Sequence, residues 1–176
     1  MIRGRDFMRL PVVTRDNGRK IGQVEDFIID RNGTRVLGIL VDEKAVFGGT
    51  RVVAWPGILG LGLDVVIIDS VTSVVKASEV PEIAEVLERD FVLVGNRVET
   101  TAGRELGKVE NFYFNPATGA VEGFELIGGR NEQAPSGQAF LPASPSFEAG
   151  KEYSFVDTPA AEAIVDLKTA LESRRE

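Results

Sequence analysis

The stretch that decides the fold is DNGRKIGQVEDFIID at residues 16–30, because a close copy of it, AGRELGKVENFYFN, follows at residues 102–115. The two copies align when the sequence is shifted by 85 residues. The matching positions are Gly18, Arg19, Ile21, Gly22, Val24, Glu25, Phe27, Val36 and Gly38 in the first copy, and Gly103, Arg104, Leu106, Gly107, Val109, Glu110, Phe112, Val121 and Gly123 in the second. Self-similarity of this kind indicates that the chain contains one structural unit twice.

Each copy is predicted to consist of short β-strands separated by tight turns. Asp16-Asn17-Gly18 suits a hairpin turn, because asparagine and glycine tolerate the positive φ angles that such turns require. The β-branched and aromatic run at residues 21–29 predicts a strand, residues 30–33 a second turn and residues 36–41 the next strand. The second copy repeats this scheme, so the fold class is expected to be mainly β.

The repeat extends further along the chain when small insertions are allowed. Trp55-Pro56 then aligns with Leu141-Pro142, and residues 65–70 (VVIIDS) align with residues 153–158 (YSFVDT). Two other stretches have apolar residues at helical spacing, residues 81–89 between the copies and residues 159–174 at the carboxyl end. These patterns predict a first domain at 1–80, a helical linker at 81–90, a second domain at 91–158 and a C-terminal helix at 159–176.

The repeated unit, residues 13–41 and 98–126, resembles the PRC-barrel family. The resemblance rests on the two glycine-turn stretches quoted above, and on residues 53–56 and 67–70, which are similar to the closing strands of the family. It implies two small, strongly bent β-barrels joined by a short helix and followed by a C-terminal helix. The resemblance also implies a role in binding other proteins. Because the motif consists of turn glycines and core positions, it specifies a fold more than a function.

The composition argues against an enzyme. The chain contains no cysteine and no histidine, which removes thiolate chemistry, the usual general base and the commonest nitrogen ligand of metals. The glycine-rich residues 57–62 lack the Lys-Ser/Thr pair of a P-loop and precede a predicted strand. Glu25 and Glu110 are equivalent strand residues that are expected to face solvent. We therefore predict no catalytic, cofactor-binding or metal-binding residues.

The charge of the chain disfavours nucleic acid as a direct ligand. Lysine and arginine total 20, aspartate and glutamate total 27, and the net charge is −7. Residues 1–88 contain 11 basic and 13 acidic side chains, and residues 89–176 contain 9 and 14, so the halves carry −2 and −5. The basic cluster in the first twenty residues is interpreted as a solvated strand face, with a docking surface for an acidic partner as the alternative. No stretch has the length and hydropathy of a signal peptide or a membrane span, and a cytoplasmic location is expected.

Two segments between predicted strands, residues 45–51 and 128–139, are the expected sites of specificity, because insertions in repeated folds often form the binding face. The residues predicted to contact a partner are Phe47, Arg51, Trp55, Tyr113, Arg130 and Asn131. Phe27 and Phe112 are expected in the cores, whereas Trp55 and Tyr113 are expected to be exposed. The predicted function is an adaptor that binds a protein partner, with partner identity and oligomeric state left open. The alternative is an RNA-associated or ribosome-assembly factor that acts through a ribosomal protein.

Overall fold

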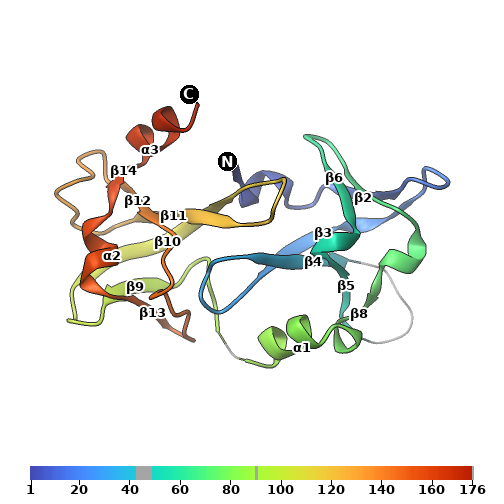
Figure 1. The fold of residues 1–176 in the computed structure, drawn as a ribbon, viewed down its shortest axis with the longest axis horizontal. Helices are drawn as coiled ribbons and strands as arrows, with labels where there is room; N and C mark the ends of the chain where they lie inside the picture. The colour runs from blue at the N-terminus through green and yellow to red at the C-terminus, as the bar shows by residue number, and fades with distance from the viewer. Residues whose placement is uncertain (43–48, 90, 176) are drawn as a thin grey trace. The chain divides into compact units, whose positions relative to one another are not determined.

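The computed structural model describes residues 1–42, 49–89 and 91–175, and it is mainly β (Figure 1). Contacts divide the chain into two compact units. Unit 1 comprises Met1–Arg3, Arg31–Arg35 and Asp90–Glu176, and unit 2 comprises Gly4–Asp30 and Val36–Arg89. Each unit is built around one curled sheet, so the predicted fold class is confirmed.

The sheet of unit 2 has the strand order β6-β7-β2-β3-β4-β5-β8. Its strands are β2 (Pro11–Thr14), β3 (Lys20–Ile29), β4 (Val36–Asp42), β5 (Arg51–Ala54), β6 (Ile58–Leu61), β7 (Val66–Ile68) and β8 (Val75–Lys76). Neighbouring strands are antiparallel, except that β2 and β7 are parallel. The helices of this unit are α1 (Pro81–Glu88) and the short 3-10 turns η1 (Gly4–Phe7), η2 (Trp55–Gly57), η3 (Val71–Ser73) and η4 (Ala77–Glu79).

The sheet of unit 1 has the order β13-β9-β10-β11-β12-β14, and β1 pairs with β10. Its strands are β1 (Ile2–Arg3), β9 (Arg97–Thr100), β10 (Glu105–Phe114), β11 (Val121–Ile127), β12 (Gln138–Pro142), β13 (Tyr153–Val156) and β14 (Val165–Asp166). The helices are α2 (Thr158–Glu162) and α3 (Leu167–Ser173). The parallel pair in this sheet is β9 and β13, as β2 and β7 are in unit 2.

The central strands of the two units repeat each other in detail. Strands β10 and β11 begin and end 85 residues after β3 and β4. The β3–β4 ladder contains a bulge at Glu25, and the β10–β11 ladder contains the equivalent bulge at Glu110. The predicted turns are confirmed as well, since Gly18 and Gly33 adopt φ angles of 63° and 62°, which glycine reaches without steric cost. The repeat therefore predicted backbone geometry as well as side-chain type.

The alignment of the outer strands needs one correction. The ladders place Ala54 opposite Gly38 and Pro142 opposite Gly123, so Pro142 is equivalent to Ala54 and the alignment with Pro56 is wrong. The alignment of residues 65–70 with residues 153–158 agrees with the ladders, because β7 pairs with β2 as β13 pairs with β9. The loops that precede β5 and β12 differ in length, and only the ladder reveals the resulting offset.

Equivalent side chains form a buried core on one side of each sheet. The buried set in unit 2 is Val12, Val24, Phe27, Ile29, Ile39, Val41, Val53 and Ile68. The buried set in unit 1 is Val98, Leu106, Val109, Phe112, Phe114, Phe124, Leu126, Leu141 and Val156. Phe27 and Phe112 are thus confirmed as core residues. In unit 1 the core is more aromatic, and Phe124 stacks on Phe147 with ring centroids 4.7 Å apart.

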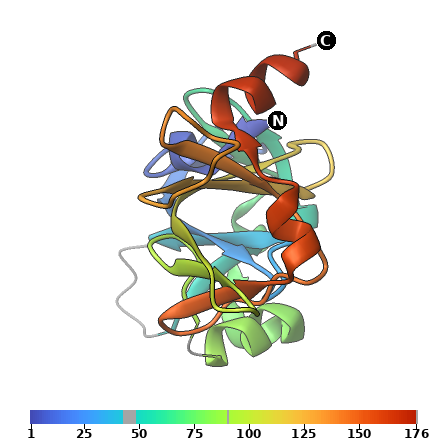
Figure 2. The same cartoon turned by 90° about the vertical axis from the view of Figure 1, so that its left-hand side faces the viewer.

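The helices cover the opposite side of each sheet. In unit 2, Ile83 of α1 packs with Ile28, Val52 and Ala77. In unit 1, Leu167 and Ala170 pack with Tyr113 and Phe140, and Met1 lies against the same cluster, so the two ends of the described chain lie side by side (Figure 2). The ladders make Tyr113 equivalent to Ile28 and Phe140 equivalent to Val52. Helices α1 and α3 are therefore the same closing element of the repeat.

The C-terminal segment is helical, but one continuous helix over residues 159–174 is a wrong prediction. Helix α2 ends at Glu162, and Val165–Asp166 forms β14 against β12 before α3 begins. Strand β8 makes the equivalent pairing with β5 in unit 2. Pairing with the sheet edge outweighs the local helical pattern, because the edge of β12 offers backbone hydrogen bonds at this point.

Unit 1 also contains eight residues from the early part of the sequence, Met1–Arg3 and Arg31–Arg35. Ile2 pairs with Phe114, and the N–H of Ala149 donates a hydrogen bond to the oxygen of Arg31 at 3.0 Å. By their position in the repeat, both segments belong to the first copy. In space, both belong to unit 1.

Candidate functional site

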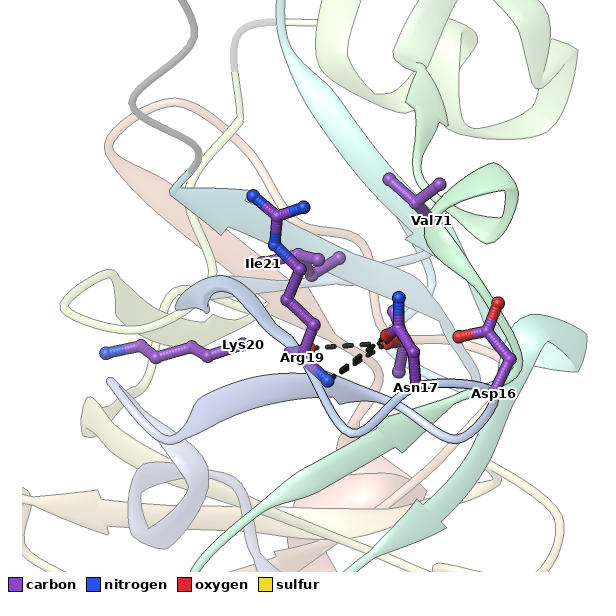
Figure 3. A pocket seen from close by; sticks show the side chains of 7 residues that line it. Asp16, Asn17, Arg19, Lys20, Ile21 and Val71 are labelled. Carbon is purple, nitrogen blue, oxygen red and sulfur yellow. Dashed lines mark hydrogen bonds between the residues drawn. The ribbon is translucent and has the colours of Figure 1, made fainter.

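A pocket with a volume of about 280 Å³ lies in unit 2, at the turn between β2 and β3 (Figure 3). It is lined by Thr14, Asp16, Asn17, Arg19, Lys20, Ile21 and Val71. Figure 3 shows Lys20 and Val71 on opposite sides of the pocket, with Arg19 extending from the turn between them. The lining therefore combines two cations, one carboxylate and two aliphatic side chains.

Hydrogen bonds hold the turn that builds this pocket. The buried Thr14 hydroxyl donates to Oδ1 of Asn17 at 2.5 Å, and the N–H of Arg19 donates to the same oxygen at 3.3 Å. The N–H of Gly18 donates to the oxygen of Thr14 at 2.8 Å. The backbone from which Arg19 and Lys20 project is therefore ordered by the protein itself, which lowers the entropic cost of binding a ligand there.

An ion pair beside the turn links β2 to the end of β7. The guanidinium of Arg15 contacts the carboxylate of Asp69, and the N–H of Arg15 donates to the oxygen of Ile68 at 2.8 Å. Arg15 is consequently neutralised by a neighbour. Arg19 and Lys20 remain as the cations that line the pocket, against one carboxylate from Asp16.

The equivalent turn of unit 1 has a different character. Thr100 and Arg104 make the same backbone contact as Thr14 and Arg19, but the loop between them is one residue shorter. Strand β10 begins with Glu105 where β3 begins with Lys20, so the charge at that position is reversed. The basic pocket is thus a feature of unit 2, and the two copies present different chemistry at the same place in the fold.

The residues predicted to contact a partner do not line this pocket. Phe47 lies outside the described residues. Arg51 and Trp55 are half-buried on β5 and η2 of unit 2, whereas Tyr113, Arg130 and Asn131 belong to unit 1. The structure therefore does not gather these residues into one site of either unit.

Tyr113 requires a correction, because its side chain is only 4% exposed. It packs edge-on against Phe140 at 6.0 Å, and its hydroxyl donates to Oε2 of Glu125 at 3.5 Å. Helix α3 and Met1 cover this face of β10. The sequence around Tyr113 could not indicate this, because both covering segments are far from Tyr113 in the chain. Tyr113 is a core residue of unit 1, so the prediction that its side chain is exposed is wrong.

In the segment predicted at residues 128–139, one of the two residues expected to contact a partner is exposed. Arg130 is exposed. Asn131 is half-buried, and its side-chain amide donates to the oxygen of Leu106 at 2.8 Å, which ties the segment to the sheet. Asn131 thus has a structural role in this segment.

The pocket residues were missed as a set, although the basic cluster in the first twenty residues was a signal for them. Val71 lies fifty residues beyond Ile21 in the sequence and completes the pocket only in three dimensions. The lining can bind an anionic group, because a guanidinium and an ammonium group each suit a carboxylate. Among the described residues, no group of three or more acidic side chains is arranged to hold a metal ion.

Comparison with known families agrees with this architecture. A family model described as the PRC-barrel domain matches residues 1–75 and, a second time, residues 87–163. The chain therefore belongs to the PRC-barrel domain family and contains two tandem copies of the domain, as the repeat predicted. No curated protein matches the chain. Within residues 1–42, 49–89 and 91–175, no helix has the length and apolar character needed to cross a bilayer.

Proposed function

We propose that this protein is a non-enzymatic adaptor and that unit 2 binds an acidic segment of a partner protein at the pocket of Arg19 and Lys20. The observation that carries the proposal is that these two cations and the aliphatic side chains of Ile21 and Val71 line the same pocket. An acidic peptide segment with an apolar side chain would satisfy both halves of such a lining. A protein of net charge −7 attracts an acidic partner only through a local cluster of this kind.

The difference between the two units supports an adaptor over a simple duplicated binder. Unit 1 carries Glu105 at the position of Lys20, so the same acidic segment would be repelled there. Two domains with distinct surfaces on one chain can contact two partners, or two parts of one partner, and linkage raises the effective concentration of the second contact.

The test is affinity capture from the native extract, comparing the wild type with Arg19→Glu. The matched control is Arg104→Glu, which makes the same charge change at the equivalent exposed turn of unit 1. We expect Arg19→Glu to weaken capture of a defined protein by about tenfold, roughly 1.4 kcal/mol, and Arg104→Glu to leave it unchanged. Equal effects of the two variants, or none, would contradict the assignment of the pocket.

The alternative role in ribosome assembly gives a different result in the same experiment. Nuclease treatment and a high-salt wash remove partners that are held through phosphate contacts, because such contacts weaken steeply with salt. Recovery of a ribosomal protein that resists both treatments would support action through that protein. Recovery of ribosomal components that both treatments remove would favour an RNA-associated complex.

A further inference from the structure

The chain contains the dipeptide Asn-Gly twice, at residues 17–18 and 32–33. Asparagine followed by glycine is especially prone to spontaneous deamidation, because glycine has no side chain to hinder attack by its nitrogen on the asparagine amide. Asn17 lines the pocket of unit 2, whereas Asn32 and Gly33 belong to unit 1. The two pairs therefore carry the same chemistry in different surroundings.

The pair Asn32-Gly33 is held against the core of unit 1. The side-chain amide of Asn32 donates to the oxygen of Phe147 at 2.9 Å. Gly33 is buried, and a Cβ atom there would lie 2.6 Å from the ring of Phe124. Deamidation requires the asparagine side chain and the adjoining backbone to rotate toward each other. Close packing and the hydrogen bond of Asn32 oppose both movements, so unit 1 protects this pair.

The pair Asn17-Gly18 lies at the exposed tip of the β2–β3 turn. Residues 15–20 are all exposed, and a Cβ atom at Gly18 would meet no atom of the described residues within 4 Å. The N–H of Gly18 donates to the oxygen of Thr14 at 2.8 Å, and this bond must open before the nitrogen can attack. Because exposed turns open locally at little cost in free energy, the folded protein permits this step.

The contacts of the Asn17 side chain favour the attack. The reaction develops negative charge on Oδ1 of Asn17. The Thr14 hydroxyl donates to this oxygen at 2.5 Å, and the N–H of Arg19 donates to it at 3.3 Å. Figure 3 shows the oxygen of Asn17 directed toward the backbone of Arg19 and the side-chain nitrogen pointing away. Donors directed at an oxygen where charge develops lower the barrier, and the nitrogen is placed to leave.

We propose that Asn17 is a deamidation site. The nitrogen of Gly18 forms a bond to Cγ of Asn17, the bond between Cγ and Nδ2 breaks, and the released nitrogen leaves as ammonia with the proton of Gly18. Water then hydrolyses the resulting succinimide ring. Cleavage at the side-chain carbonyl gives aspartate, and cleavage at the main-chain carbonyl gives isoaspartate.

The reaction changes the charge of the pocket. Either product adds a second carboxylate to that of Asp16, so the carboxylates equal the cations Arg19 and Lys20 in number. Attraction for an acidic segment falls as a result, and deamidation weakens binding at this pocket. This consequence rests on the proposed function, whereas the reaction at Asn17 does not.

The first test follows deamidation of the full chain at mildly alkaline pH, by peptide mass spectrometry and an assay for isoaspartate. We expect residue 17 to react at least about ten times faster than residue 32 in the folded protein, because the second pair reacts only after the core of unit 1 opens. The matched control is the same protein in denaturant, where the two pairs should react at similar rates. Equal rates in the folded protein, or a slower reaction at residue 17, would overturn the proposal.

The variant Thr14→Val tests the role of the hydroxyl. It removes one donor to Oδ1 of Asn17 and keeps a side chain of similar size. We expect residue 17 of the folded variant to deamidate about tenfold more slowly, and the unfolded variant to react at the wild-type rate. Faster deamidation of the folded variant would show that the hydroxyl protects Asn17 and would overturn its assigned role.

The effect on binding is tested with Asn17→Asp, which is the aspartate product, in the affinity capture described above. We expect capture of the defined protein to fall roughly threefold, because one unfavourable charge is added. The matched control is Ala102→Asp, which adds a carboxylate at the equivalent exposed turn of unit 1 and should leave capture unchanged. Unchanged capture by Asn17→Asp would overturn the effect on binding. The first test needs no partner protein, so its outcome is independent of the proposed function.

Discussion

Asp26 and Asn111 accept the same hydrogen bond in the two units. In each case the side-chain Oδ1 receives the N–H of the phenylalanine that follows, at 2.8 Å from Phe27 and at 3.0 Å from Phe112. Both residues directly follow the extra residue of a β-bulge. Asn111 is 2% exposed. Asp26 as a whole is exposed, but its carboxyl is partly buried, and this burial raises the pKa of Asp26. The same backbone N–H thus donates to a side-chain amide oxygen in unit 1 and to a carboxylate oxygen in unit 2.

Replacing the carboxylate in unit 2 should increase stability. Asp26→Asn retains the hydrogen bond from the N–H of Phe27 and removes a carboxylate charge that burial disfavours. The negative charge of the neighbouring Glu25 also raises the pKa of Asp26, to a smaller extent. Because the folded pKa of Asp26 is raised above the unfolded value of about 3.9, its ionisation lowers stability as pH rises through that interval. We expect a gain below about 1 kcal/mol at pH 7, since solvent screens the exposed side chain, and none near pH 3. Denaturant unfolding at the two pH values measures this; an equal gain at both would contradict the electrostatic cause.

The reverse exchange in unit 1 should be costly. Asn111→Asp places a carboxylate at a buried position, and we expect the free energy of unfolding to fall by about 3 kcal/mol at pH 7. The loss should shrink as pH falls, because protonation removes the buried charge. Urea unfolding curves across pH 4–8 test this, with Asp26→Asn as the paired control. A loss that is independent of pH would indicate a steric cause.

Two equivalent glycines allow the sheets to close. A Cβ atom at Gly38 would collide with the backbone oxygen of Val53, and one at Gly123 would lie 2.5 Å from the oxygen of Leu141. We expect Gly38→Ala and Gly123→Ala each to destabilise the protein by about 2 kcal/mol or more, because the overlap forces neighbouring strands apart. Gly60→Ala is the control, with only an ordinary side-chain contact. Thermal unfolding of dilute protein compares the three; a similar melting temperature for all would refute the close approach.

Because α1 and α3 are equivalent elements, we expect α1 to stabilise unit 2 and α3 to stabilise unit 1. Ile83→Ala should open a cavity under α1, and Leu167→Ala a cavity under α3, each at a cost of about 3 kcal/mol. Amide hydrogen exchange should then accelerate in the sheet of unit 2 for Ile83→Ala and in the sheet of unit 1 for Leu167→Ala. Each variant serves as the control for the other. Acceleration over the whole chain in either variant would indicate that the units do not unfold separately.

Acid should loosen α3 before the rest of unit 1. Hydrogen bonds from the side chain and backbone of Ser136, together with the N–H of Lys168, hold the pKa of Asp166 below its ordinary value. The contribution of this cap is therefore complete above the unfolded pKa of about 3.9 and is lost as pH falls through the lower folded pKa. Amide exchange of α3 between pH 6 and pH 2 measures the effect. In Asp166→Asn the acid-dependent step should disappear; its persistence would assign the step to another carboxyl.

Features that depend on local sequence were predictable. The turn glycines, the two long strands and the burial of Phe27 and Phe112 follow from patterns within about thirty residues, because turn chemistry and alternation act over short distances. Because the two copies align at a shift of 85 residues, each prediction for one copy also applied to the other. The basic cluster that contains Arg19 and Lys20 was also visible, although it was interpreted as a solvated face.

Long-range packing decided the rest. Whether Tyr113 is exposed depends on α3, which begins more than fifty residues later, and the pocket needs Val71 beside the β2–β3 turn. The sequence by itself thus determined that one β-domain occurs twice and where its turns lie, since glycine conformations and strand alternation are local properties. Only the tertiary structure decided that Arg31–Arg35 lies in unit 1 and that β6 comes last in the order of the described strands of its sheet. Strand pairing joins segments that are far apart in the sequence, so no local pattern predicts it.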